Sequence, residues 1–261
     1  MEILQQIIEH KRKEVAENKS LFPLELLKRS AHYTAPCISM KEYILREDKN
    51  GIIAEFKRKS PSKPSINLYA NPEKISISYM QAGASALSVL TDKTFFGGSN
   101  EDLTTARNFN LCPILRKDFI IDVYQIHESK SIGADAILLI AEVLTKDEII
   151  EFTKLAHSLS LEVLLELHHE EELEKTIEDV DLIGINNRNL KTFEVDFETS
   201  LRLLKKLPSK PLKISESGIQ TPEDYAYLRK SGFDGGLIGE RFMKEPNPGA
   251  VCKQFSNLIL Q

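Results

Sequence analysis

Cysteine is scarce in this sequence of 261 residues, and the three that occur, Cys37, Cys112 and Cys252, lie far apart. Neither a disulfide framework nor a metal site has that spacing, so we expect three reduced thiols in a reducing compartment. No apolar run approaches the ~20 residues that span a bilayer. The first 20 residues lack a signal-peptide core and carry four glutamates. These absences predict a cytoplasmic protein with no membrane partner.

An excess of positive charge is also missing, since 34 basic residues face 39 acidic ones and the net charge is −5. That balance disfavours a nucleic-acid partner, although a local cationic pocket for a small anion is compatible with it. The 41% hydrophobic and 28% charged contents are those of an ordinary globular protein, which excludes disordered and fibrous structure. The length is close to the limit for one hydrophobic core.

A change of character at residue 51 divides the chain. Residues 1–48 are predicted as a helical extension, because Ile3, Ile7, Ile8 and Val15 fall near one face. After residue 51, short apolar runs alternate with amphipathic stretches whose starts carry capping signals, as at 71–73, 99–101 and 221–223. The predicted strands are 52–56, 86–90, 112–115, 136–140, 162–167, 182–186, 212–215 and 236–239.

Eight βα units whose strand starts are 20 to 34 residues apart predict a closed (β/α)8 TIM barrel over residues 49–261. The runs are apolar without polar alternation, as expected for strands buried on both faces. An open doubly wound sheet is the alternative. It favours a glycine-rich dinucleotide turn after the first strand, where this sequence has KRKSP at 57–61.

Polar side chains recur at the carboxyl ends of five predicted strands. Alternate residues of a strand face the same side, and a barrel of this kind carries its chemistry at the carboxyl ends. A solvated rim explains any one polar residue there, but five strands in register favour a shared polar floor. The residues on that parity are Glu55, Lys57, Lys117, Glu166, Asn186, Arg188, Ser215 and Ser217.

The mixture of acids and cations predicts proton transfer. We expect the lysines to donate protons, with their pKa lowered by neighbouring cations and burial, and Glu166 to accept protons with a raised pKa. These strand ends have no Ser-His-Asp grouping and no cysteine beside a histidine, so acyl-enzyme catalysis is not supported. His168 and His169 are adjacent and point to opposite faces of a strand, so we predict no metal site. A substrate with an activatable carbonyl would need no cofactor.

Two glycines follow the last two predicted strands, Gly218 within 216–219 and Gly239 within 237–240. In (β/α)8 barrels the loops after strands seven and eight frequently hold a phosphate on backbone N–H groups. Because Lys59 and Ser60 follow the first strand, we predict a phosphate site here. Either glycine alone is equally consistent with an ordinary turn.

Seven motifs occur in this order along the chain: IIAEFKRKSPSK, LTDKTFFGGS, LRKDFIID, LLELHHEEEL, GINNRNL, SESGI and LIGERFM. With the N-terminal MEILQQIIEHKRKEV, they resemble the indole-3-glycerol-phosphate synthase family over essentially the whole chain. The resemblance implies a cofactor-free carboxy-lyase of tryptophan biosynthesis. Its substrate would be 1-(2-carboxyphenylamino)-1-deoxyribulose 5-phosphate, and its products indole-3-glycerol phosphate, carbon dioxide and water.

The resemblance also implies roles for the charged residues. Lys117 is similar to the family's general acid, which protonates the ketone as the aromatic ring carbon attacks it. Glu166 and Lys57 would share proton transfer in the later dehydration, and the division of labour between the two lysines stays open. Glu55 would position neighbouring cations and substrate. Arg188 would lie near the carboxylate that is lost.

Further residues would orient or enclose the substrate. By resemblance, Asn186 and Ser217 join the polar floor, and the remaining contacts with the substrate are Lys59, Ser60, Phe96, Phe119, Leu190, Glu216, Gly218, Gly239 and Glu240. Phe96, Phe119 and Leu190 would wall the aromatic ring, and packing of loops onto the barrel is the alternative for the phenylalanines. The sequence departs from the family pattern at Pro64, where glycine is expected, and at Arg241, where a small residue is more frequent. We expect Pro64 to change how the first loop closes and Arg241 to alter the phosphate environment.

Two other functions are compatible with a barrel of this kind. Phosphoribosylanthranilate isomerase would use a cysteine and an aspartate as its acid–base pair, whereas the first strand here offers Glu55 and Lys57, and Cys37 precedes the barrel. A non-catalytic barrel retained as a scaffold is the second alternative. The sequence leaves the oligomeric state open, a monomer being one option, and the expected partner is a small phosphorylated substrate.

Overall fold

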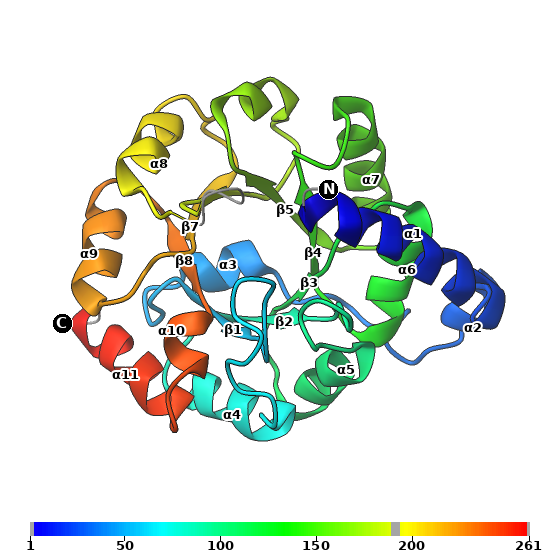
Figure 1. The fold of residues 1–261 in the computed structure, drawn as a ribbon, viewed down its shortest axis with the longest axis horizontal. Helices are drawn as coiled ribbons and strands as arrows, with labels where there is room; N and C mark the ends of the chain where they lie inside the picture. Colours follow the sequence, from blue (N-terminus) through cyan, green and yellow to red (C-terminus); the bar gives the residue numbers. More distant parts are fainter. Residues whose placement is uncertain (1–2, 189–193, 260–261) are drawn as a thin grey trace.

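The computed structural model describes residues 3–188 and 194–259, and it contains a closed barrel of eight parallel strands in sequential order (Figure 1). The barrel closes where β1 pairs with β8. This confirms the predicted fold class. The strands are β1 (Ile52–Phe56), β2 (Ala86–Leu90), β3 (Ile114–Lys117), β4 (Ala136–Ile140), β5 (Glu162–Leu167), β6 (Leu182–Asn186), β7 (Leu212–Glu216) and β8 (Gly235–Ile238).

Helices surround the barrel and follow the predicted starts. The side chains of Asn71, Ser99 and Thr221 each accept a hydrogen bond from the backbone N–H three residues later, which satisfies a free donor of the first turn. The helices are α1 (Ile3–Leu21), α2 (Leu24–Leu27), α3 (Met40–Leu45), α4 (Pro72–Gln81), α5 (Asn100–Phe109), α6 (Val123–Ile132), α7 (Lys146–Ser158), the 3-10 helix η1 (Glu170–Lys175), α8 (Phe197–Leu204), α9 (Pro222–Lys230), α10 (Glu240–Met243) and α11 (Pro248–Ile259).

The N-terminal extension is less helical than predicted. Pro23 precedes α2, and residues 28–39 form turns and extended chain before α3. Proline lacks the N–H that would continue α1, and Ser39 starts α3 afresh by accepting from the N–H of Glu42. In Figure 1 one end of α1 lies over the barrel beside β4 and β5, and the helix runs outward past α6.

Three predicted strands have other bounds in the structure, and β8 lies one residue earlier than predicted, at Gly235–Ile238. β3 begins at Ile114 rather than Cys112, because Pro113 has no N–H to donate to a neighbouring strand. β7 extends one residue further, to Glu216, and this shift matters for the site. None of the described helices is long and apolar enough to cross a membrane.

The barrel interior is apolar at its amino end. Ile53, Leu115, Leu164 and Ile214 pack there with Met40 of α3, and all are nearly inaccessible to solvent. The Glu162 carboxylate at the start of β5 accepts the Ser39 hydroxyl and the Met40 N–H, which fixes α3 under the barrel. The ionisable groups that line the cavity described below lie at the other end, where the strands finish.

Candidate active site

A cavity of about 190 Å³ opens at the carboxyl ends of the strands. It gathers most of the residues that the sequence singled out, and its lining also includes Ile3, Leu4 and Ile7 of α1, which the sequence did not place there. The predicted residues on its wall are Glu55, Lys57, Ser60, Phe96, Lys117, Phe119, Glu166, Asn186, Arg188, Glu216, Ser217, Gly218, Gly239 and Glu240. Lys59 is absent from this lining, and Leu190 lies outside the described residues.

The centre of the cavity is an ion cluster around Lys117. The Lys117 ammonium donates to Glu166 Oε2, and it donates to Glu216 Oε2 at 2.9 Å. Asn186 Nδ2 donates to the second oxygen of Glu166 at 3.1 Å. A second pair lies on β1, where Lys57 Nζ donates to Glu55 Oε1 at 2.6 Å. Side chains from β1, β3, β5, β6 and β7 therefore meet in one chamber, and the parity argument predicted the inward residues of all these strands except β7.

Strand β7 was placed in the wrong register. Glu216, rather than Ser215, faces the interior with Ile214, while the Ser215 hydroxyl accepts from Asn187 Nδ2 at 3.0 Å outside the barrel. Ser217 reaches the cavity rim by a different route, because its φ of 64° turns the chain at the end of the strand. Glu216 is thus a third carboxylate of the ion cluster.

Two glycines leave the space that these carboxylates occupy. A Cβ at Gly184, on β6, would collide with Glu216 Oε1, and a Cβ at Gly239 would collide with Glu55 Oε1. Neither glycine has a left-handed φ, so backbone freedom does not explain them. Gly239 therefore leaves room for the Glu55 carboxylate, which is a role separate from the predicted phosphate seat.

The pKa directions of the cluster are opposite to those predicted for Lys117 and Glu166. Burial alone would lower the pKa of Lys117, but Glu166, Glu216 and Glu55 outweigh it, so the pKa is raised. Burial alone would raise the pKa of Glu166, but Lys117 and His168 hold it well below the usual value. Burial raises the pKa of Glu216 to about 8, with Glu166 adding to the rise and Lys117 opposing it.

These directions separate two carboxyl groups that share one lysine. At neutral pH Glu166 is an ionised base, whereas Glu216 keeps its proton. Pairs of acids whose environments push their pKa values apart are the usual arrangement for combined acid and base catalysis. The cluster can therefore give and take protons in the same chamber.

His168 is a site residue that the sequence reasoning missed. Its Nε2 lies 3.0 Å from Glu166 Oε1, its side chain is buried, and its ring lines the cavity. Burial lowers and the Glu166 carboxylate raises the pKa of His168, and the net direction is upward. The signal was present, because residue 168 has the same strand parity as Glu166.

One group of described residues could approach a metal ion. Ligand atoms of Glu142, His168 and Glu172 lie within 4.8 Å of one another. Glu172 Oε2, however, already accepts the N–H groups of His168 at 2.6 Å and His169 at 3.3 Å. His168 Nδ1 faces Glu142 Oε2 at 4.0 Å. The hydrogen-bonded carboxylate and the ion pairing of His168 favour a structural role for this group.

Residues of the predicted anion seat, Gly218, Gly239 and Glu240, line the same cavity. Gly218 has a φ of 78°, and a Cβ there would collide with Val195, so this turn requires glycine. Gly239 caps the start of α10, and the Glu240 carboxylate accepts from Lys63 Nζ at 2.5 Å and from Arg188 at 3.4 Å. Backbone N–H groups at the start of a helix suit an oxyanion.

Lys59 and the two unusual residues occupy specific places. The Lys59 ammonium donates to the Thr94 carbonyl at 2.8 Å, away from the cavity, which differs from the predicted cradle. The loop turns back before Pro64, because Ser60 and Lys63 exchange backbone hydrogen bonds. Arg241 lines the cavity, and its guanidinium binds the Gln220 carbonyl and Glu245.

Aromatic and aliphatic side chains form the remaining wall. The Phe96 and Phe119 rings lie 5.9 Å apart and tilted, and both face the cavity. Ile3 and Ile7 approach from α1. A flat aromatic substrate group would find an apolar surface here next to the Lys117 ammonium.

Fold and site together define a (β/α)8 barrel with a cluster of ionisable groups in a cavity at the carboxyl ends of its strands. The family model for "Indole-3-glycerol phosphate synthase" matches residues 4–255. Curated relatives of that name are 50% identical over 258 residues in Bacteroides thetaiotaomicron, covering 99% of both chains, and 42% identical over 248 residues in Acinetobacter baumannii, covering 94% of this chain and 92% of the relative. The chain belongs to the indole-3-glycerol phosphate synthase family.

Solved structures with a similar fold are more distant. A thiamine phosphate pyrophosphorylase from Pyrococcus furiosus has a TM-score of 0.61 at 14% identity, covering 82% of this chain and 96% of that one. A tryptophan synthase alpha-subunit from the same organism has a TM-score of 0.58 at 14% identity, covering 80% and 96%. At these identities the similarity supports the barrel fold alone.

Proposed function

We propose that this chain catalyses the ring closure, decarboxylation and dehydration that convert 1-(2-carboxyphenylamino)-1-deoxyribulose 5-phosphate into indole-3-glycerol phosphate, as a carboxy-lyase of tryptophan biosynthesis. Membership of the family supports this reaction. The single observation that carries the assignment of residues is the meeting of Lys117 with Glu166 and Glu216, between an apolar wall and an anion seat.

Ring closure needs a proton for the ketone oxygen. As the ring carbon that bears the carboxylate attacks the ketone carbon, negative charge develops on the oxygen, and the Lys117 ammonium supplies the proton. A developing alkoxide is basic enough to take it even though the pKa of Lys117 is raised. Glu216 Oε2 lies 2.9 Å from Lys117 Nζ, and the protonated Glu216 then returns a proton to the amine.

Loss of carbon dioxide then restores electrons to the ring. We assign Arg188 to orient the departing carboxylate, because its guanidinium lines the cavity and is tethered to Glu240 at 3.4 Å. The aromatic ring lies against Phe96 and Phe119. The phosphate is held by Ser60 and by backbone N–H groups at the anion seat, without Lys59.

Dehydration needs a base and an acid. The ionised Glu166 removes the proton from the carbon whose electrons form the new double bond, and Lys57 protonates the hydroxyl as it leaves as water. Asn186 holds Glu166 in place through its 3.1 Å hydrogen bond. Each positioned acid or base typically contributes ~10²–10⁴-fold in rate.

A fluorescence assay tests the proposal directly. The sequence has no tryptophan, so growth of indole fluorescence on adding the substrate comes from product alone. Growth that depends on Lys117 supports the proposal. A flat trace from folded protein that still binds substrate would favour the non-catalytic scaffold, and turnover of phosphoribosylanthranilate would favour the isomerase.

Location and partners are part of the same proposal. The expected ligand is the phosphorylated substrate, with no nucleic-acid or membrane partner. A cytoplasmic location suits a biosynthetic reaction on a soluble metabolite, and a monomeric state is consistent with a cavity lined by one chain. Sedimentation of the purified protein tests the monomer.

A further inference from the structure

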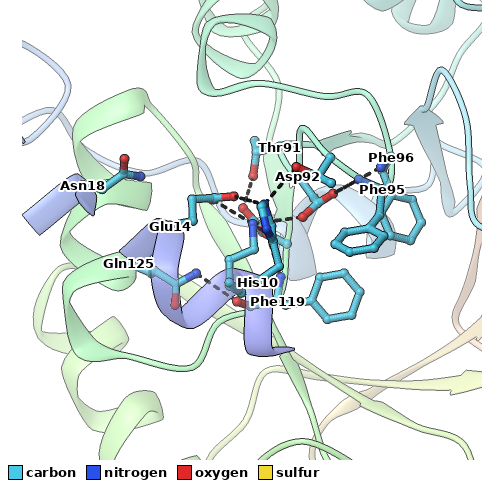
Figure 2. Close-up of polar contacts among 12 residues, drawn as sticks. His10, Glu14, Asn18, Thr91, Asp92, Phe95, Phe96, Phe119 and Gln125 are labelled. Atoms are coloured by element: carbon cyan, nitrogen blue, oxygen red, sulfur yellow. Dashed lines mark hydrogen bonds and ion pairs between the residues drawn. The ribbon is translucent and has the colours of Figure 1, made fainter. Parts of the chain in front are cut away.

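A buried lysine on α1 lies outside the ion cluster of the active site. Lys11 has no solvent exposure, and its ammonium lies 2.9 Å from Asp118 Oδ1, 3.1 Å from Asp92 Oδ2 and 2.8 Å from Glu14 Oε1. Figure 2 shows Glu14 of α1 and Asp92 in this region, with Phe95, Phe96 and Phe119 close by. A buried charge is costly unless it is paired, so three carboxylates around one ammonium need a reason.

The two aspartates are themselves buried and each holds one loop. Asp92 Oδ1 accepts the backbone N–H groups of Phe95 at 2.7 Å and Phe96 at 3.2 Å. Asp118 Oδ1 accepts the Phe119 N–H at 2.8 Å. The carboxylates therefore fix the backbone from which the aromatic wall of the cavity projects.

Lys11 is the cation that holds both carboxylates together. Asp92 Oδ2 makes no hydrogen bond to any described residue, so its ion pair with Lys11 is what compensates this buried oxygen. Asp118 has further partners in Thr91, at 2.6 Å, and Arg116. Lys11 and Arg116 outweigh burial, and the pKa of Asp118 falls to about 2. One ammonium thus bridges the two buried carboxyl groups, at 3.1 Å from Asp92 and 2.9 Å from Asp118.

The position of Asp118 links this cluster to catalysis. Lys117, Asp118 and Phe119 are consecutive. One short segment therefore carries the lysine of the ion cluster, the partner of Lys11 and part of the aromatic wall. α1 also contributes Ile3, Leu4 and Ile7 to the cavity lining. Docking of α1 through Lys11 therefore helps to position the aromatic wall, the backbone beside Lys117 and the α1 residues of the cavity lining.

We infer that Lys11 is a positioning residue of the active site, which holds Asp92 and Asp118 together and thereby fixes the aromatic wall and the backbone beside Lys117. This inference rests on the proposed function. Because misplacement of a reacting group by about 1 Å can cost ~10²-fold in rate, a loosened wall should be visible in kinetics before it is visible in the fold.

Lys11→Met tests the inference. The substitution keeps much of the side-chain volume and removes the cation. We expect kcat/KM to fall at least tenfold at a temperature where circular dichroism shows a folded protein. We also expect faster amide hydrogen exchange in peptides covering 92–99 and 118–122, because the N–H groups of those segments lose their fixed acceptors.

Two further variants separate positioning from stability. Val15→Ala loosens the same helix at a buried contact with Leu27 and Tyr124, remote from the two aspartates, and should leave kcat/KM within twofold and the two peptides protected. The double variant Lys11→Met with Asp92→Asn removes one buried charge of each sign. It leaves Asp118 balanced by Arg116, so it should fold with the same kinetic loss.

The outcomes are distinct. Lys11→Met with wild-type kcat/KM and protection, or Val15→Ala with an equal loss, would overturn the inference. If neither Lys11 variant folds, the cluster is a requirement of the fold and the positioning role is wrong. If the wild-type protein itself shows no turnover, the proposed function fails, while hydrogen exchange still decides whether Lys11 fixes the two loops.

Discussion

Replacing Glu216 by glutamine converts a buried carboxyl that keeps its proton at neutral pH into a neutral group of the same shape. Burial raises the pKa of Glu216 to about 8, Glu166 adds to the rise and Lys117 opposes it. In the unfolded chain the same group titrates near its ordinary value of 4.5. At neutral pH the folded protein therefore keeps a proton on Glu216 that the unfolded chain releases.

The magnitude follows from linkage. The pKa is raised in the folded protein, so the unfolding free energy falls as pH rises from 4.5 towards 8 and levels off above it. At pH 7 the unfolded form is 2.5 pH units above its pKa of 4.5, and at ~1.4 kcal/mol per unit the cost to the wild-type protein is about 3 kcal/mol. Glutamine carries no such cost.

Urea unfolding at pH 5 and pH 7 measures this. We expect the stability of Glu216→Gln relative to wild type to increase by about 2 to 3 kcal/mol between the two pH values, since at pH 5 most of the cost is absent. Glu223→Gln, at an exposed glutamate of α9, is the control for removal of one carboxylate. Parallel curves for wild type and Glu216→Gln would refute the argument, because they would mean that Glu216 ionises normally in the folded protein.

The same variant tests the chemistry. If Glu216 returns the proton to Lys117, glutamine should lower kcat by ~10²-fold or more, with a smaller change in KM. A stabilised variant with reduced turnover is the expected combination, since a site that stores an unfavourable protonation state trades stability for activity. Full activity in Glu216→Gln would remove Glu216 from the proton path.

Three other substitutions address separate features of the site. Lys117→Ala should lower kcat by ~10²–10⁴-fold while KM changes less, and a raised KM at unchanged kcat in steady-state assays would contradict its role as general acid. Gly184→Ala places a Cβ against Glu216 Oε1, so the unfolding free energy should fall by about 1–3 kcal/mol in urea titrations and activity should drop with it. His168→Asn removes the imidazole whose interaction lowers the pKa of Glu166, so the acid limb of the kcat/KM profile should move to higher pH; an unmoved limb would mean that Lys117 alone keeps Glu166 ionised.

The barrel was predictable because strands buried on both faces leave unbroken apolar runs in the sequence. β4 and β5 are bounded as the runs predicted. β3 was displaced because Cys112 and Pro113 are apolar and look like strand residues, although Pro113 cannot donate to the ladder. The turns between residues 28 and 39 interrupt the predicted helical extension, since only tertiary contacts such as those of Ser39 decide where α3 begins.

The site was predictable as far as strand parity extends. Lys117 and Glu166 meet as the alternation required. The prediction of which β7 residues face the interior was wrong because Glu216 is flanked by two serines. Nothing in the local sequence shows whether the glutamate or the serines face the interior. The deciding fact is the space left by Gly184 on the neighbouring strand, which is a property of the register between β6 and β7.

The pKa directions could not be read from the sequence for a related reason. A lysine near cations would have a lowered pKa, but the closed barrel delivers three carboxylates to Lys117 from three different strands. The direction of a pKa shift depends on which charged groups are buried beside the residue. The order of β1, β5 and β7 along the chain does not show which side chains meet there. His168 was overlooked because its neighbour His169 suggested a metal pair.

The N-terminal extension links these observations. α3 closes the amino end of the barrel with Met40, while α1 covers part of the other end and docks through Lys11. With both ends restricted, water has limited access to the chamber around Lys117, and burial becomes the largest influence on the pKa of Glu216. A residue far from the reacting atoms, such as Lys11, then influences proton transfer by keeping the chamber closed. The unfavourable proton on Glu216 and the buried ammonium of Lys11 therefore both depend on burial, which the barrel provides for the first and the docking of α1 on the barrel for the second.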